Sequence, residues 1–300
     1  MRGKIIFVSI LTVLASINSR AYDSNTDQIK YVPGRKLCTL ETLLITEASG
    51  IAASRRNQSV LWIHNDSGDA ANLYALNPEG RLLGIYIISG AYNRDWEDIA
   101  IGPGPDPNND YLYIGDIGDN GGNHRSITIY RVQEPKIDPN MTLTRMSTES
   151  AESIQLVYPD GPKDAETLMV DSLKGDIYIV TKRQLYCTVY YAPYPQSTLT
   201  QITMSRVAVL PWTLAVGGDI SKDGNYIIVR SPTHASIWKR PKDKPLWEAF
   251  GQQPFNIELM PELKGEAICF DSDSYGFFTI SEMKNPPLYY YEYSKVFDLN

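Results

Sequence analysis

One sequence pattern of three short strands recurs five times along this chain, and that repeat restricts the fold more than any other feature. Each copy opens with a small or acidic residue followed by alternating apolar positions, and two further apolar strands follow after polar turns. Tyr, Ile, Val and Trp dominate the strands, whereas Gly, Asp, Asn and Pro separate them. We call the opening residues the anchors; they are Ser49, Glu97, Glu166, Gly218 and Glu266.

The repeats predict an all-β chain folded as a single β-propeller with five blades, because blades of four strands recur about every 40–50 residues. A looser fourth strand follows in four repeats, at 82–88, 153–158, 202–210 and 255–260. The fifth repeat ends before its fourth strand, and we expect the N-terminal segment 35–45 to supply it and close the ring. A degenerate sixth blade at 193–211 is the alternative. Residues 118–123 and 136–149 are expected to form surface loops.

The N-terminus has the layout of a secretory signal peptide at residues 1–21. Arg2 and Lys4 precede an apolar run at 5–17, and the small residues Ser19 and Ala21 end the segment. The run is short for a membrane span, and no second such run follows. We therefore expect residues 22–300 to form a secreted propeller with no membrane span; a membrane-anchored chain is the alternative.

Charge and cysteine content narrow the function classes. The formal net charge of −7 disfavours nucleic-acid binding and favours cations or basic partners. Three cysteines leave at least one thiol free or paired with another chain, so the fold is not a disulfide scaffold. The sequons at Asn57 and Asn140 lie in polar segments, which predicts exposed N-glycosylation sites.

Many polar residues are expected at one end of the central channel. In a propeller the first strand of each blade lines the channel, and the loop after the second strand opens at the end where the first strand begins. Side chains two apart on a strand point the same way, so the anchors and the residues two positions earlier should converge. The resulting channel-mouth candidates are Glu47, Asp66, Asp95, Asp116, Asp164, Lys182, Arg183, Asp219, Arg230 and Glu282.

Three anchors are glutamates, and three carboxylates near one axis need a counter-charge. Oxygen ligands without Cys and with little His select calcium or magnesium, and calcium is abundant outside cells. The sequence therefore predicts a calcium site. The alternative is that Lys182, Arg183, Arg230 and Lys264 neutralise the glutamates without any metal.

Three segments, 96–101, 165–170 and 265–270, each place Glu before an apolar alternation and resemble the calcium-activated nucleotidases. Those are secreted five-bladed propellers that hold calcium in the channel and cleave nucleotide phosphates. Residues 47–52, 62–68 and 164–168 also resemble phytase-like and functionally unassigned secreted propellers. The resemblance implies calcium-facing positions at Ser49, Glu97, Glu166 and Glu266. Gly218 departs from it, since glycine offers only a backbone carbonyl.

Two functions follow as hypotheses. The first is a secreted calcium-binding glycoprotein that binds an extracellular ligand or a matrix or mineral component. The second is a calcium-dependent phosphohydrolase, in which the metal activates water and polarises a phosphoryl oxygen. Lys182, Arg183 and Arg230 would then bind phosphate, with Asp116 or Glu282 as base. No motif assigns catalytic residues, because the chain lacks a nucleophile elbow or a phosphate-binding Gly-Lys-Ser sequence.

Overall fold

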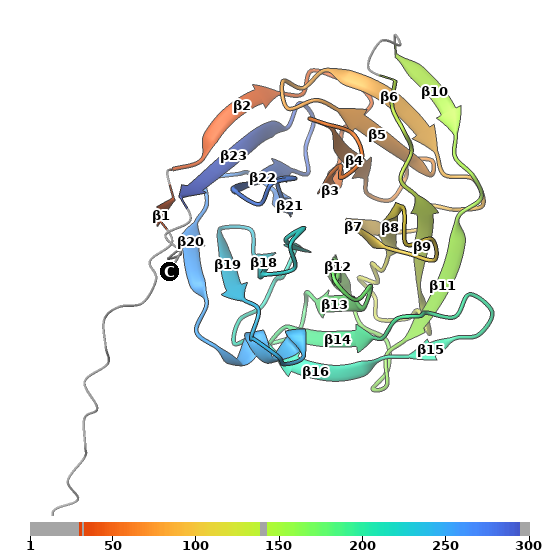
Figure 1. Cartoon of the computed structure of the whole chain (residues 1–300), viewed down its shortest axis with the longest axis vertical. Coiled ribbons are helices and arrows are strands. Elements are labelled where there is room, and N and C mark those ends of the chain that lie inside the picture. Colours follow the sequence, from red (N-terminus) through yellow and green to blue (C-terminus); the bar gives the residue numbers. More distant parts are fainter. Residues whose placement is uncertain (1–29, 32, 139–142, 295–300) are drawn as a thin grey trace, which may run out of the picture.

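Five small sheets form a closed ring, as the repeats predict (Figure 1). The computed structural model describes residues 30–31, 33–138 and 143–294. The predicted signal peptide at 1–21 and the sequon at Asn140 lie outside these residues. The architecture is that of a five-bladed β-propeller.

The innermost strand of each sheet starts at or beside an anchor. Each innermost strand contacts its two neighbours around the ring. In four of the five, at least five residues are buried, which explains the apolar sequence that follows each anchor. The innermost strands are β3 (Ala48–Ala53), β7 (Trp96–Pro103), β12 (Ala165–Val170), β17 (Gly217–Ile220) and β21 (Gly265–Phe270).

Two more strands follow in chain order in every blade, each antiparallel to the one before. The second strands are β4 (Leu61–Asn65), β8 (Asp110–Asp116), β13 (Ile177–Thr181), β18 (Tyr226–Arg230) and β22 (Gly276–Ser281). The third strands are β5 (Asn72–Leu76), β9 (Ile127–Gln133), β14 (Thr188–Ala192), β19 (His234–Lys239) and β23 (Pro287–Ser294).

The outer strand of the last blade comes from the N-terminal segment, which confirms the predicted closure. Strand β2 (Arg35–Thr39) pairs antiparallel with β23, and β1 (Lys30–Tyr31) pairs with the same strand. Leu40 and Ile45, which follow β2, are fully buried. Burial of each such side chain stabilises a fold by about 1.5–3 kcal/mol. The other outer strands are β6 (Leu82–Ile87), β11 (Glu152–Val157), β16 (Ser205–Val209) and β20 (Phe255–Glu258).

Two short strands cross to the neighbouring blade, which the sequence did not predict. Strand β10 (Thr144–Ser147) pairs parallel with β6, and β15 (Ile202–Thr203) pairs parallel with β11. The expected loop at 136–149 therefore contains an edge strand, and the fourth strand of the third repeat begins only at Ser205. Residues 193–211 hold outer strands alone, so there is no sixth blade. The 3₁₀ helix η1 (Leu246–Gly251) packs beside β16 and β19.

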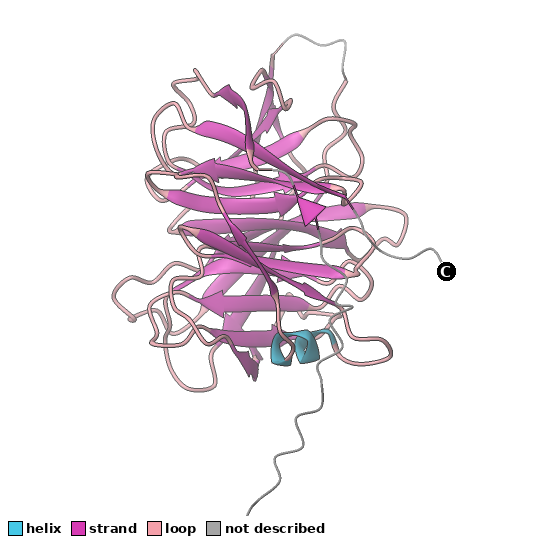
Figure 2. Cartoon of the chain, turned by 90° about the vertical axis from the view of Figure 1, so that its left-hand side faces the viewer, coloured by secondary structure: helices cyan, strands magenta, loops and turns pink. Residues whose placement is uncertain are grey.

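The hydrophobic core lies between adjacent blades and not on the axis. One cluster joins Tyr113 and Ile129 to Leu168 and Ile179 of the next blade, and four similar clusters occupy the other interfaces. The side view shows the blades as stacked strands with loops at both ends (Figure 2). In the described part of the chain all three cysteines are unpaired, and no helix is both long and apolar enough to cross a membrane.

Candidate metal centre

Four of the five anchors sit at β-bulges where their strands pair with the second strand of the blade. The pairing register shifts across Ser49, Glu97, Glu166 and Glu266, each of which is skipped in the ladder. A bulge leaves one residue unpaired and re-aims its side chain. Strand β17 pairs without a shift at Gly218. The bulge thus explains how four blades turn an anchor toward the axis, and why the fourth blade does not.

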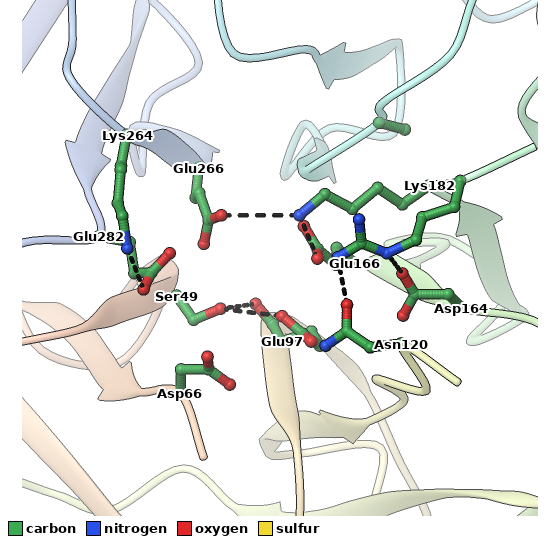
Figure 3. Close-up of polar contacts among 12 residues, drawn as sticks. Ser49, Asp66, Glu97, Asn120, Asp164, Glu166, Lys182, Lys264, Glu266 and Glu282 are labelled. Carbon is green, nitrogen blue, oxygen red and sulfur yellow. Dashed lines mark hydrogen bonds and ion pairs between the residues drawn. The ribbon is translucent and has the colours of Figure 1, made fainter. Parts of the chain in front are cut away.

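Glu97 is the residue at which two groups of carboxylates meet. Figure 3 shows it with Asp66, Asp164 and Glu166. With Asp66 and Asp95 it forms one group, and with Asp164 and Glu166 a second. Within each group one oxygen from every carboxylate lies within 4.8 Å of the other two. The structure therefore brings together five carboxylates from three blades, around a glutamate that is only 4% exposed.

Basic side chains neutralise only part of this end of the ring. Lys182 Nζ bonds Glu166 Oε1 and lies 3.8 Å from Glu266 Oε1. Arg183 Nε lies 2.6 Å from Asp164 Oδ2. None of the ion pairs among the described residues includes Glu97, Asp66 or Asp95.

Crowding and burial make the ionised state of these carboxyls costly. Burial, and then the neighbouring Glu166, Asp66 and Asp95, raise the pKa of Glu97 well above its usual value. Burial likewise raises the pKa of Asp66 to about 6 and of Glu166 to about 7. For Glu266, burial and then Glu166 raise the pKa to about 8. A cation would relieve this cost, because an opposite charge favours the ionised form.

Two structural details test whether these residues fit a metal ion. Glu166 Oε2 is buried and has no hydrogen-bond partner among the residues that the structure describes. A Cβ placed on Gly118 would collide with the carboxylates of Asp95 and Glu97, so the absence of a side chain there keeps their oxygens accessible. All donors are carboxylate oxygens, which suit calcium or magnesium. The residues fit a hard divalent cation.

The predicted ligands Ser49 and Glu266 have different neighbours. The Ser49 hydroxyl donates to the backbone oxygen of Glu97 at 2.8 Å and lies 3.4 Å from its carboxylate. Ser49 is therefore placed to orient Glu97. Glu266 faces Lys182, as Figure 3 shows, and belongs to neither carboxylate group.

Two of the channel-mouth candidates, Arg230 and Asp219, lie in the wall of the ring and not at the mouth of the channel. The Arg230 side chain is fully buried and donates to the backbone oxygens of Ser231 and Ala267, with Glu262 as its ion-pair partner at 3.4 Å. Asp219 accepts the backbone N–H groups of Ile220 and Phe270 at 2.8 and 2.9 Å. Both side chains tie the fourth blade to the fifth, because Arg230 donates to Ala267 and Asp219 accepts from Phe270.

The remaining candidates lie around the carboxylate groups. Asp116 pairs with Arg94 at 3.2 Å and accepts the backbone N–H of Asp95. Glu282 pairs with the exposed Lys264 at 3.1 Å. Glu47 is exposed, and its backbone oxygen accepts the N–H of Asp66.

Asp98 was not among the site candidates predicted from the sequence, although Asp98 follows an anchor as Asp219 does. Its carboxylate accepts the N–H groups of Ile99 in its own blade, Leu168 in the next and Gly218 in the one after, at 2.9, 2.9 and 3.3 Å. The shared Asp-Ile dipeptide after two anchors was the available sequence signal.

The expected exposure of Asn57 is wrong. Its side chain is buried, and its amide nitrogen donates to Ser54, Glu134 and the backbone oxygen of Pro135. Its amide oxygen accepts the N–H of Ile137. The polar sequence around Asn57 reflects these internal hydrogen bonds and not an open turn.

No model of a known protein family matches the sequence, and no curated protein matches it. The structure is similar to that of a protein from Xanthomonas campestris described as a gluconolactonase important in glucose secondary metabolic pathways. The TM-score is 0.46 and the sequence identity 12%, over 87% of this chain and 89% of that one. At this degree of similarity a shared activity does not follow. The chain is a five-bladed β-propeller with buried axial carboxylates suited to a divalent cation.

Proposed function

We propose that this protein is a secreted calcium-binding β-propeller that presents an axial calcium ion to an extracellular ligand. Glu97, Asp66 and Asp95, with Asp164 and Glu166 alongside, would supply the oxygen ligands. One observation supports this most: Glu97 joins two carboxylate groups at the axis, is nearly buried and takes part in no ion pair among the described residues.

Three further features support the proposal. The Glu166 oxygen without a hydrogen-bond partner lies in the second carboxylate group. The donor set lacks sulfur and imidazole, which disfavours zinc. The N-terminal sequence has the pattern of a signal peptide, and an extracellular protein meets calcium at concentrations that a weak carboxylate site can use.

The ligands come from separate blades, so only the closed ring brings them together. A cation held there binds the folded state preferentially and links the first three blades across the axis. The same position leaves the ion accessible from the end of the ring where Asp66 and Arg183 are partly exposed. An anionic group of an extracellular partner would complete the coordination from that side.

Isothermal titration with calcium tests the proposal. The unmodified protein should bind calcium, and Glu97→Gln should lose that binding, because an amide keeps the shape of the carboxylate but not its charge. Glu282→Gln is the matched control, since it makes the same change at the same end in a residue that pairs with Lys264. Absence of calcium binding by the unmodified protein, or equal binding by Glu97→Gln, would contradict the proposal.

A calcium-dependent phosphohydrolase is the second candidate, and Arg183 favours it. This side chain is half exposed and lies beside Asp164, so a cation for substrate phosphate adjoins the carboxylates. Bound calcium would supply a Lewis acid there. The buried Arg230 is not available for phosphate. Phosphate release from a panel of nucleotides and phosphate esters, dependent on calcium and lost in Glu97→Gln, would support this activity; no release would exclude it for that panel.

A further inference from the structure

Lys182 lies among the anchors as a cation supplied by the chain itself. It follows β13, and its backbone N–H donates to the oxygen of Asp164 at 3.0 Å. The side chain reaches between Glu166 of the third blade and Glu266 of the fifth, and is 14% exposed. Figure 3 shows its nitrogen between these two carboxylates. The ammonium of Lys182 is therefore shared, as an ion-pair partner, by two of the three anchor glutamates.

The fourth blade explains why this place is open to Lys182. Its anchor is Gly218, which has no side chain to send toward the axis. A Cβ at Gly218 would lie 2.8 Å from the backbone oxygen of Ile228 and 2.9 Å from Thr167 Cγ2, so the packing of the wall excludes any larger residue. The sector between Glu166 and Glu266 thus lacks a carboxylate of its own.

The three anchor glutamates are consequently unequal. Glu166 Oε1 and Glu266 Oε1 both face the ammonium of Lys182. Glu97 adjoins Glu166 but also Asp66 and Asp95, and apart from Glu166 these residues have no basic partner among the described ion pairs. A divalent cation placed near Lys182 would be repelled by it, and repulsion between like charges a few ångströms apart is strong in a partly buried site.

We infer that Lys182 determines where and how tightly the cation binds: it holds Glu266 out of the coordination sphere and confines a single calcium ion to the side of Glu97. This inference rests on the proposed calcium function. The side chain acts as a built-in competitor for the anchors, so the site is weaker and more asymmetric than three convergent glutamates would make it. Lys182 is a specificity-determining residue and not a ligand.

A double-mutant cycle in calcium titrations tests this role. Lys182→Met should raise calcium affinity about tenfold or more, because it removes the competing charge and leaves a side chain of similar length. Glu266→Gln should change the affinity of the unmodified protein less than about threefold. In the Lys182→Met background, Glu266→Gln should reverse most of the gain, since Glu266 is then free to bind calcium.

Lys264→Met is the matched control for Lys182→Met. It removes another ammonium at the same end of the ring, one that pairs with Glu282 and is 59% exposed. It should alter calcium affinity much less than Lys182→Met does. An equal effect of both substitutions would show that general charge, and not the placement of Lys182, sets the affinity.

The outcomes separate this inference from the proposed function. If the unmodified protein binds calcium but Glu266→Gln weakens that binding tenfold, the ion displaces Lys182 and the inference is wrong. If only the Lys182→Met protein binds calcium, the proposed function fails while Lys182 still acts as the competitor. If neither protein binds calcium, both are wrong.

Discussion

Glu97 and Asp98 are consecutive residues of β7, and both carboxylates are nearly or fully buried. Burial is the first cause that raises the pKa of each well above its usual value. Their hydrogen bonds differ. Asp98 accepts three backbone N–H groups from three blades. Within the described ranges the Glu97 carboxylate has only the hydroxyl of Ser49, and other acids surround it.

The difference shows which buried carboxylate marks a binding site. Burial and a raised pKa are common to both, so neither property separates them. The hydrogen-bond donors separate them: Asp98 has three backbone donors, while in the described part of the chain Glu97 has only the Ser49 hydroxyl, at 3.4 Å. A buried acceptor without donors costs free energy unless a ligand supplies the positive charge. Asp98 is therefore structural, and Glu97 is the candidate ligand.

The largest expected effect is the loss of stability on replacing Asp98, the structural carboxylate of the two. Asp98→Ala leaves the N–H groups of Leu168 and Gly218 without a partner inside the wall. Each unsatisfied buried donor costs about 1–3 kcal/mol, so the free energy of unfolding should fall by about 2–6 kcal/mol. Urea unfolding in calcium and in chelator measures it. A loss that appears only in calcium would assign Asp98 to the metal site instead.

Calcium itself should have the next largest effect. At a free concentration one hundred times its dissociation constant, a ligand that binds only the folded state stabilises it by about 2.7 kcal/mol. Chelation should therefore lower the melting temperature of the unmodified protein by several degrees.

Glu97→Gln should melt at the same temperature with and without chelator. In chelator it should be at least as stable as the unmodified protein, because the amide relieves carboxylate repulsion. If Glu97→Gln were instead destabilised equally at every calcium level, the carboxylate would be serving an internal ion pair.

The pH dependence of stability extends the comparison to Asp219, the other carboxylate in the wall of the ring. Burial raises the pKa of Asp219 to about 7. The folded protein then keeps a proton that the unfolded chain has released, so stability falls as pH rises between about 4 and 7. The slope is at most about 1.4 kcal/mol per pH unit for one such group.

Asp219→Asn should remove this part of the pH profile, whether or not calcium is present. Unfolding free energies of the two proteins at pH 4.5, 6 and 7.5 give the difference directly. Identical profiles would mean that Asp219 is ionised throughout and is stabilised by its two backbone donors alone.

The smallest expected effect concerns Ser49, whose hydroxyl bonds the backbone oxygen of the candidate ligand Glu97. Ser49→Ala removes one hydroxyl donor to the backbone oxygen of Glu97 and should cost about 1 kcal/mol of stability. It should also weaken calcium binding modestly, because Glu97 loses the side chain that orients it. Weakening as severe as that of Glu97→Gln would make Ser49 a direct ligand.

Much of the architecture was predictable because it depends on local patterns. Alternating apolar residues, turn residues and the in-phase anchors appear in each repeat separately, so the five blades and the closure by 35–45 follow from reading along the chain. The convergence of Glu97 and Glu166 follows from the same reasoning, since equivalent positions of a ring must face its axis. Strands β10 and β15 were not predictable, because their short sequences gain pairing partners only from a neighbouring blade.

The sequence by itself therefore determined the propeller, the position of its anchors and the excess of acidic groups at one end. The tertiary structure decided which charges meet. Lys182 and Arg230 look alike in the sequence, yet one reaches the anchors and the other is buried in the wall. The bulges that aim the glutamates, and the distances between groups on different blades, exist only once the ring has closed. Electrostatic interactions depend on those distances and on burial, and no local sequence pattern encodes either.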